Sequence, residues 1–232
     1  MTGSELKDIT EWDTVNWGKA IKYIEKLCLP IKECQVLEIG SRNGGMSLFF
    51  ANRGGRCLCT DIKEPGNKAK DKHRKYNVSD RIEYKTLDAT QIPNNYENMF
   101  EIVTFKSVLG GIGSYENIVN EQMVVEGIKH VLKKNGYVVF IENMQSTRMH
   151  RYLRRRFKNN AIYWHYQTDA NIMGLFKDFV LVKKSYFGFF GLFGPNEILR
   201  RILGYIDYLF ELFLPDSYKY VGVYVFQYLK GN

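Results

Sequence analysis

The chain has 232 residues, 45% of them hydrophobic and 15% aromatic, which is enough to build a substantial core in one domain. Its 33 basic and 25 acidic residues give a net charge of +8, which favours anionic partners without choosing among nucleic acid, anionic lipid and phosphorylated substrates. Cys28, Cys34, Cys57 and Cys59 adjoin apolar segments and form no metal-ligand spacing, so we expect free thiols in a reducing compartment and no metal site.

The N-terminus, MTGSELKDITEW, lacks a basic stretch followed by an apolar run, so the sequence predicts no signal peptide and a cytosolic protein. An amphipathic helix is expected at about 17–27. Downstream, short apolar or β-branched runs alternate with helical patterns, which is typical of a parallel sheet wrapped by helices. The strands are predicted at 35–39, 56–60, 82–87, 101–105 and 136–142.

A helix stop is predicted at Lys133-Lys134-Asn135-Gly136, where cations and a glycine precede the run YVVFI. Two more strands are expected at 179–187 and 219–228, separated by an apolar helical insert at 188–217. The sequence therefore predicts an α/β protein with a Rossmann-like, mostly parallel sheet of seven strands and helices on both faces. We expect one domain over 1–232 with an N-terminal helical cap at 1–30.

Residues 36–50, VLEIGSRNGGMSLFF, form a glycine-rich strand-to-helix turn, in itself a weak signal of nucleotide binding. A dinucleotide site needs Gly40, a glycine at 42 and Gly45, but position 42 holds Arg42 and a carboxylate stands at Glu38. That carboxylate would repel a pyrophosphate. It is compatible, directly or through water, with a cofactor that carries a cationic amine and no phosphate.

Acids also end the next two predicted strands, and ligands bind such sheets beyond the carboxyl ends of the strands. Asp61 follows Gly40 by about 21 residues, where an acid accepts hydrogen bonds from both ribose hydroxyls. Asp88 precedes the small Ala89, a pair suited to an adenine amino group and ring. Each acid alone is equally explained as a helix cap or turn residue, but three on successive strand ends indicate a nucleoside cofactor.

With these motifs the sequence resembles the class I S-adenosylmethionine-dependent methyltransferases over residues 30–185. The resemblance rests on LEIGSRNGG, TDI, LDAT, FEIVTFKSVLGGIG and VLKKNGYVVFIEN. Two features depart from the family: Arg42 replaces a usual glycine, so we expect its backbone rather than its guanidinium to line the cofactor, and the fourth strand lacks a following acid or asparagine. The resemblance implies S-adenosyl-L-methionine as cofactor, bound by Glu38, Gly40, Ser41, Arg42, Asn43, Gly44, Asp61, Ile62, Asp88, Ala89, Lys106 and Ser107.

FKSVLGGIG, ENMQSTRMHRYLRRRF and YFGFFGLFG further resemble a bacterial subgroup linked to glycan and surface-polysaccharide biosynthesis. This implies a sugar hydroxyl as methyl acceptor, on a glycan or on a small or lipid-linked molecule. Such an acceptor benefits from a general base, for which Glu142, His150 and His165 are candidates near the ends of strands four and five. A structural hydrogen bond explains Glu142 equally well, and a packing or surface role explains each histidine.

Two further segments concern partners. In TRMHRYLRRRFKNN, Met149, Leu153 and Phe157 recur along one face among arginines, which indicates a basic amphipathic helix, either a cationic binding surface or a solvated face above a docked apolar stripe. In the aromatic-rich insert, the polar residues fall on one helical stripe and apolar residues on the remainder. Its uncharged runs are shorter than the roughly 18 residues needed to span a bilayer. The segment 186–214 is therefore expected to contact a membrane interface at the inner face, form a homodimer or lid surface, or pack onto the domain.

Three functions remain open: an O-methyltransferase acting on a glycan or small molecule, an RNA methyltransferase, and a non-catalytic membrane or protein adaptor on the same fold. The arginines favour RNA, but no base-methylation signature is visible. Nucleic acid is therefore the less favoured partner.

Overall fold

The computed structural model describes residues 1–157 and 163–229, apart from the side chains of Glu116 and Phe157. Its centre is a seven-stranded sheet in the order β3-β2-β1-β4-β5-β7-β6, in which only β7 runs antiparallel to its neighbours. The mostly parallel, Rossmann-like sheet predicted from the sequence is confirmed. The strands are β1 Gln35–Ile39, β2 Arg56–Asp61, β3 Ile82–Thr86, β4 Phe100–Lys106, β5 Leu132–Asn143, β6 Val180–Phe187 and β7 Val221–Gln227.

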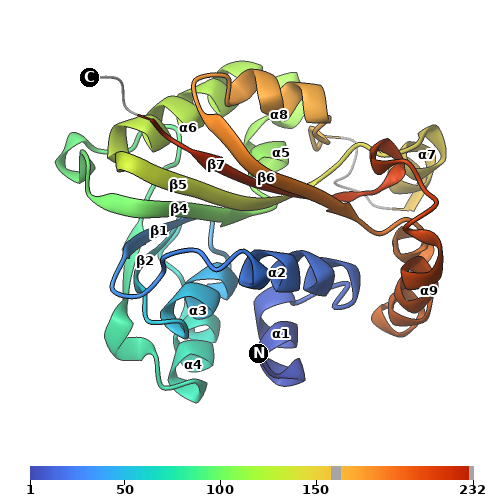
Figure 1. Cartoon of the computed structure of the whole chain (residues 1–232), viewed down its shortest axis with the longest axis horizontal. Helices are drawn as coiled ribbons and strands as arrows, with labels where there is room; N and C mark the ends of the chain where they lie inside the picture. Colours follow the sequence, from blue (N-terminus) through green and yellow to red (C-terminus); the bar gives the residue numbers. More distant parts are fainter. Residues whose placement is uncertain (158–162, 230–232) are drawn as a thin grey trace.

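Helices cover both faces of this sheet (Figure 1). The α-helices are α1 Gly3–Thr10, α2 Asn16–Lys26, α3 Gly45–Ala51, α4 Asn67–Lys75, α5 Leu109–Ile112, α6 Ile118–Val131, α7 Arg148–Phe157, α8 Asp169–Leu175 and α9 Glu197–Phe210. Short 3-10 turns are η1 Ser79–Arg81, η2 Asn94–Tyr96, η3 Ser114–Glu116, η4 Phe190–Phe193 and η5 Asp216–Tyr218.

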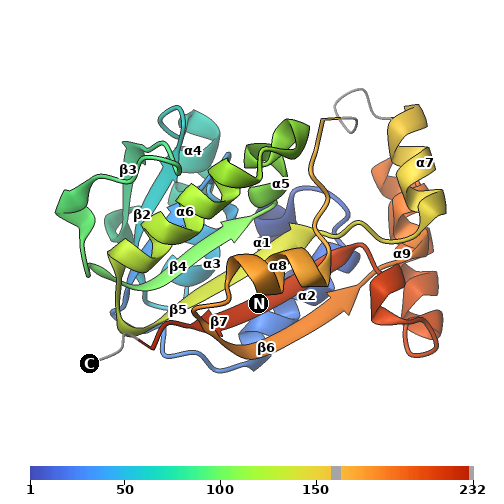
Figure 2. The same cartoon turned by 90° about the horizontal axis from the view of Figure 1, so that it is seen from above.

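The apolar core has two layers, one on each face of the sheet. Side chains of α1, α2 and α3, such as Ile9, Trp17 and Phe49, are buried on one face, and those of α6 and α8, such as Ile128 and Ile172, on the other. β4 and β5 are buried on both faces, which explains why they read as continuous apolar runs in the sequence. Figure 2 shows α7 and α9 together beyond the carboxyl end of the strands.

Two local predictions require correction. The helix stop lies earlier than Lys133-Lys134-Asn135-Gly136, because α6 ends at Val131 and β5 begins at Leu132. Asn135, not Gly136, takes the left-handed conformation, with φ of 65°. The irregular register between Phe100 and Ile102 occurs where this turn joins the β4–β5 ladder.

The inward face of α7 also differs from the predicted apolar stripe. Met149 is about half exposed, whereas His150 and Arg154, one helical turn apart, are buried. Polar contacts explain the choice: His150 Nε2 bonds Phe189 O at 2.9 Å, and Arg154 Nη1 donates to Met144 O at 2.8 Å. Phe157, the third residue of the predicted stripe, has no described side chain.

Candidate active site

The glycine-rich turn between β1 and α3 forms the centre of the candidate site. Gly40 and Gly44 have φ of 61° and 67°, a conformation that costs other residues free energy. A Cβ atom on Gly40 would lie 2.7 Å from Val108 Cγ2, so side chains are excluded there on packing grounds as well. Ser41 continues the turn, donating its N–H to Thr60 O and accepting that of Gly44.

Arg42 occupies a position that glycine would favour, because its φ is 54°. Its backbone N–H donates to Asp61 Oδ2 at 2.7 Å, which ties the turn to the end of β2. The guanidinium instead lies 5.3 Å from the centre of the Trp12 ring. The side chain is thus directed to the N-terminal segment, and the turn presents backbone at this position.

Glu38 lies behind the turn, 2% exposed. Its Oε1 accepts the N–H of Met46 at 3.0 Å and its Oε2 that of Ser47 at 2.8 Å, so the carboxylate caps the N-terminus of α3. Burial raises the pKa of Glu38 above its usual value, against the effect of these donors. Both oxygens are engaged, so Glu38 acts here on the shape of the turn, and a contact with a cofactor amine stays a prediction.

The ends of β2 and β3 adjoin this turn. Asp61 Oδ1 accepts the N–H of Ile62 at 2.7 Å, and Ile62 itself is 64% exposed, which is unusual for an isoleucine beside a strand. Asp88 Oδ1 accepts the N–H of Thr90 at 2.9 Å and so shapes the loop that holds the buried Ala89. The pairing of β2 with both β1 and β3 brings the three strand-end acids predicted from the sequence to one edge.

Lys106 and Ser107 end β4 on the same edge. Lys106 Nζ donates to Ile9 O at 2.7 Å and Thr10 O at 2.9 Å, the last carbonyls of α1, and lies 4.3 Å from the centre of the Trp12 ring. Burial lowers the pKa of Lys106 to about 7. Ser107, at φ of 60°, accepts a hydrogen bond from Asn143 Nδ2 at 2.5 Å, which joins the ends of β4 and β5.

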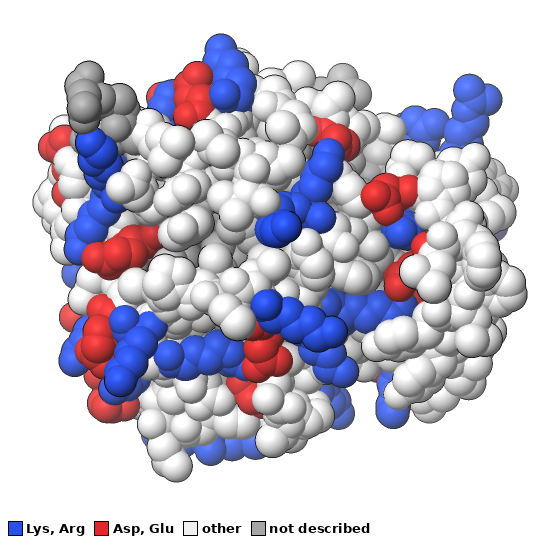
Figure 3. All heavy atoms as spheres, viewed as in Figure 1, with Lys and Arg blue, Asp and Glu red and all other residues white. Residues whose placement is uncertain are grey.

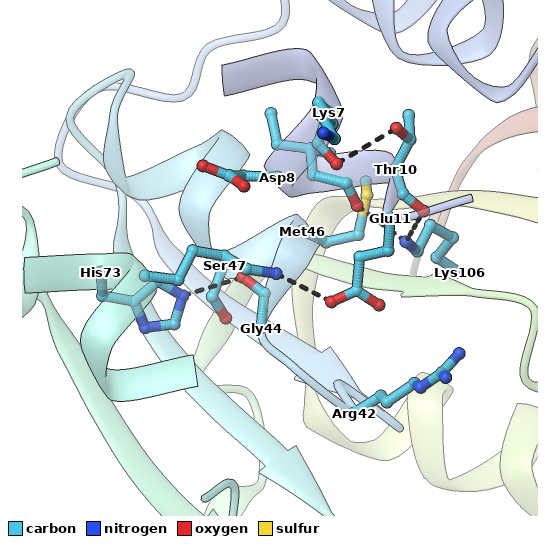
Figure 4. Close-up of polar contacts among 12 residues, drawn as sticks. Lys7, Asp8, Thr10, Glu11, Arg42, Gly44, Met46, Ser47, His73 and Lys106 are labelled. Atoms are coloured by element: carbon cyan, nitrogen blue, oxygen red, sulfur yellow. Dashed lines mark hydrogen bonds and ion pairs between the residues drawn. The ribbon is translucent and has the colours of Figure 1, made fainter. Parts of the chain in front are cut away.

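The N-terminal segment contributes residues that the sequence analysis did not identify. Glu11 accepts from Lys72 Nζ at 2.9 Å and also hydrogen-bonds Asn43 of the turn. Burial acts to raise the pKa of Glu11, but Lys72 and Lys106 outweigh it and hold that pKa below its usual value. Figure 4 shows Glu11 reaching from the end of α1 between Lys106 and the turn. No sequence motif marks these contacts, because Glu11 and Lys72 are 61 residues apart.

Of the three predicted bases, Glu142 and His150 are fully buried. Glu142 Oε1 accepts the N–H of Val108 at 2.6 Å and of Leu109 at 2.7 Å, and burial raises its pKa to about 7. His150 bonds Thr147 Oγ1 through Nδ1 and Phe189 O through Nε2, and burial lowers its pKa. Neither side chain is open to an acceptor in this conformation.

His165 has a different environment. Its Nδ1 lies 2.7 Å from Oε1 of the buried Glu121, its Nε2 lies 3.3 Å from Asn171 Nδ2, and 16% of its side chain is exposed. The backbone N–H of His165 donates to Gly110 O, in the segment that follows β4. A carboxylate beside Nδ1 favours the tautomer with Nε2 as the acceptor, and Asn171 Nδ2 is the donor that faces Nε2.

A pocket of about 380 Å³ opens at the carboxyl end of β5, beside β6. Its lining includes the polar residues Gln145, Ser146, Thr168 and Lys184 and the aromatic Tyr186. Asp169 in the same wall accepts hydrogen bonds from the hydroxyl groups of Tyr186 and Tyr224 and from Lys184 Nζ. The pocket thus offers several hydrogen-bonding groups on a partly aromatic wall.

Two further predictions concern metals and membranes. Within residues 1–157 and 163–229, no group of His, Cys, Asp or Glu is arranged to hold a metal ion. In the same part of the chain, no helix is both long and apolar enough to cross a bilayer.

Known proteins share this architecture. A model of the methyltransferase domain matches residues 37–140, which run from β1 to β5 and include the strand ends described above. A search of curated proteins finds no match. Among solved structures, an S-adenosylmethionine-dependent methyltransferase from Methanosarcina mazei superposes with a TM-score of 0.64 at 16% identity, covering 89% of this chain and 97% of its own.

A geranyl diphosphate C-methyltransferase from Streptomyces coelicolor, solved with Mg²⁺, geranyl diphosphate and S-adenosyl-L-homocysteine, gives a TM-score of 0.65 at 9% identity over 91% of this chain and 79% of that one. The shared sheet and the matched domain define the class: a Rossmann-like methyltransferase. Residues 37–140 match the methyltransferase domain, and the fold of the described chain is that of the S-adenosylmethionine-dependent methyltransferases. Its strand ends fit that cofactor, since the exposed Ile62 offers an apolar surface beside the Asp61 carboxylate.

Proposed function

We propose that the enzyme methylates a hydroxyl group of a sugar, carried on a glycan or on a small or lipid-linked acceptor. The observation that supports this is the pocket at the end of β5, whose amide, hydroxyl and carboxylate groups match the many donors and acceptors of a polyol. The pocket lies past Asn143, at the carboxyl end of β5. Lys106 and Ser107 end the neighbouring parallel strand β4, so they lie on the same edge of the sheet.

On the donor side, S-adenosylmethionine supplies an electrophilic methyl group when bound. We propose that Asp61 accepts hydrogen bonds from its ribose, that Ile62 and Ala89 flank its adenine beside Asp88, and that the backbone of Gly40 through Gly44 lines its amino-acid end. Glu38 and Lys106 then position this site, one through α3 and the other through α1. Holding donor and acceptor aligned is worth up to roughly 7–11 kcal/mol of the barrier.

For the acceptor proton, His165 is the best supported of the three candidate bases. Its imidazole is 16% exposed, pairs with Glu121 and Asn171, and lines a neighbouring pocket, whereas Glu142 and His150 are fully buried. A positioned base of this kind contributes about 10²–10⁴ in rate. We further propose that the enzyme works in the cytoplasm, peripherally at the inner face of a membrane, with contact through 186–214 rather than through a homodimer.

The test is a transfer assay with labelled S-adenosylmethionine against free sugars, nucleotide sugars, lipid-linked glycans and RNA. We expect the labelled methyl group to be recovered as a methyl ether on a sugar. Gln145→Ala should raise the acceptor KM roughly five- to tenfold, the loss of about one hydrogen bond, with kcat and the donor KM little changed. Gln145 suits this test because it lines the pocket and its side chain carries no structural hydrogen bond in the described part of the chain.

Two comparisons complete the assay. Gln35→Ala, at an exposed glutamine that begins β1, is the matched control and should behave like the parent. Asp61→Asn should instead raise the donor KM, because its amide cannot accept the Arg42 N–H and a ribose hydroxyl together. Methylated RNA with a steep salt dependence, and no labelled sugar, would contradict the proposal and assign the α7 arginines to nucleic acid.

A further inference from the structure

The orientation of α9 is the reverse of that expected for a surface helix. A surface helix normally buries its apolar stripe and exposes its polar one. In α9 the residues Ile198, Ile202, Tyr205 and Leu209 recur at helical spacing and are all more than half exposed, and Leu209 is 70% exposed. Just past the helix, Leu212 and Phe213 are 90% and 81% exposed. The exposed face is therefore the apolar one.

The two acids of α9 and Glu211, just past its end, face the protein, where each is engaged. Glu197 accepts the backbone N–H groups of Asp13 and Thr14 at 2.8 and 2.9 Å. Glu211 accepts the N–H of Gly188 and pairs with Lys19 Nζ at 3.1 Å. Because these bonds reach α2 and the segment before η4, these acids fix the helix with its apolar face outward.

Asp207, between these two acids, is fully buried. Its Oδ1 accepts the N–H of Phe189 and Phe190, and its Oδ2 accepts that of Gly191 and a hydrogen bond from Asn16 Nδ2, all within 2.7–3.0 Å. These hydrogen bonds hold the apolar face of α9 outward, and contiguous exposed apolar patches mark interaction sites.

Basic side chains adjoin this face. The turn η4 packs against α9 and also against α7, where the His150 ring stacks on Phe193 with centroids 4.8 Å apart. α7 carries Arg148, Arg151 and Arg155 at its surface and no acid, and its Tyr152 is 66% exposed. Figures 1 and 2 both show α7 and α9 at the same end, and Figure 3 shows an uncharged surface there with basic side chains above it.

We infer that the outward face of α9, with Leu212 and Phe213, enters the interface of an anionic lipid membrane while the α7 arginines bind the lipid phosphates. An apolar helix face flanked by cations is the pattern that inserts at a lipid surface. This deepens the proposed membrane contact of 186–214: it selects one helix face and adds α7, and it does not depend on methyl transfer.

A second copy of the chain fits this surface less well. A twofold interface brings the same patch of both copies together, so the arginines of α7 would need carboxylates from the same patch. The acids of α9 are engaged within the protein, and the exposed Asp216 pairs with Lys219 at 2.7 Å. A phospholipid surface supplies both an apolar layer and phosphates for Arg148, Arg151 and Arg155.

The experiment is cosedimentation of the full chain with vesicles of phosphatidylcholine alone or mixed with phosphatidylglycerol. We expect binding to the mixed vesicles and much weaker binding to phosphatidylcholine. The double variant Leu209→Gln/Phe213→Gln should lower partitioning at least roughly tenfold, since two large side chains lose their apolar burial. Val119→Gln, which changes a 62% exposed residue on α6, is the matched control and should bind like the parent.

A second double variant tests the contribution of the α7 arginines to vesicle binding. Arg148→Gln/Arg155→Gln should weaken binding to the mixed vesicles roughly fivefold for each arginine and leave phosphatidylcholine binding unchanged. Lys63→Gln/Lys68→Gln, two exposed cations beside and on α4, is the control. All these side chains are exposed or at the surface, so urea unfolding should match the parent in each variant.

Equal binding to both vesicle types would overturn the inference. So would a vesicle-independent dimer, seen by sedimentation velocity, that Leu209→Gln/Phe213→Gln dissociates, because the face would then belong to a second copy. Donor binding, measured by the shift in melting temperature with S-adenosylmethionine, reports on the methyltransferase site separately. If the protein binds the donor but no vesicles, the lipid inference is wrong and the methyltransferase proposal is unaffected.

Discussion

Glu142 shows what an enclosed carboxylate does at the end of β5. Its Oε1 holds the N–H groups of Val108 and Leu109, which fixes how the chain leaves β4, and its Oε2 accepts the N–H of Asn143 at 3.2 Å. Burial removes water from the charged form and raises its pKa to about 7, against these hydrogen bonds. The folded state therefore keeps a proton on Glu142 at pH values where the unfolded chain has lost it.

This difference predicts a pH dependence of stability. Between the unfolded pKa near 4.5 and the folded value near 7, the folded state binds more protons, so the free energy of unfolding falls as pH rises across that window. Glu142→Gln, which keeps an oxygen for Val108 and Leu109, should lose this component, worth at most about 3 kcal/mol. Urea unfolding at several pH values measures it, with the exposed Glu83→Gln as control. Parallel pH profiles for parent and Glu142→Gln would contradict the expectation.

Other site residues show where sequence reasoning reaches its limit. The positions of Glu38, Asp61 and Asp88 at strand ends follow from strand period and parallel topology, so the sequence was sufficient to group them. The atoms that each carboxylate holds were not predictable. Glu38 accepts hydrogen bonds from backbone N–H groups of α3, and Asp61 accepts one from Arg42, whose backbone is left-handed. The local turn geometry determines which donors face each acid.

At the scale of elements, strands were easier to predict than the exposed faces of helices. The seven strands lie within a few residues of the predicted segments, because their apolar runs follow from burial between two helical layers. The faces of α7 and α9 depend on partners that are distant in sequence. His150 bonds a carbonyl 39 residues away, and Asp207 bonds Asn16, 191 residues away. Helical periodicity alone predicts that α7 buries its apolar side. In the structure it buries His150 and Arg154 instead, because both make hydrogen bonds to the protein.

Asp207→Asn tests how strongly those bonds hold α9. The asparagine amide group carries two hydrogens and would face donors at Gly191 or Phe189, leaving buried N–H groups unpaired. We expect the free energy of unfolding to fall by about 2–3 kcal/mol, the cost of one or two buried unsatisfied donors. Urea denaturation measures this, and Asp216→Asn, at an exposed carboxylate on η5, should change it by less than about 0.5 kcal/mol. If Asp207→Asn also lowered the free energy of unfolding by less than about 0.5 kcal/mol, packing rather than these hydrogen bonds would orient the helix.

At the scale of the whole molecule, the N-terminal segment and the carboxyl edge of the sheet form one unit. α1 contacts α2 and α3, and its last carbonyls receive Lys106 from the end of β4. Trp12 lies beside both Lys106 and Arg42, and Glu11 reaches Asn43 of the glycine-rich turn. The chain's beginning thus covers a turn that the sheet alone would leave open, and donor binding should depend on whether this cover is in place.

Lys106→Met tests that dependence. The methionine keeps most of the packing against Trp12 but removes both hydrogen bonds to α1, so we expect the free energy of unfolding to fall by about 2 kcal/mol and limited proteolysis within residues 1–14 to accelerate. Affinity for S-adenosylmethionine, measured by calorimetry, should fall several-fold, because Glu11 and Trp12 would no longer be held over the turn. Lys85→Met, at a surface lysine on β3, should leave all three measurements unchanged. Faster proteolysis with unchanged donor affinity would show that the cover serves stability and takes no part in binding the donor.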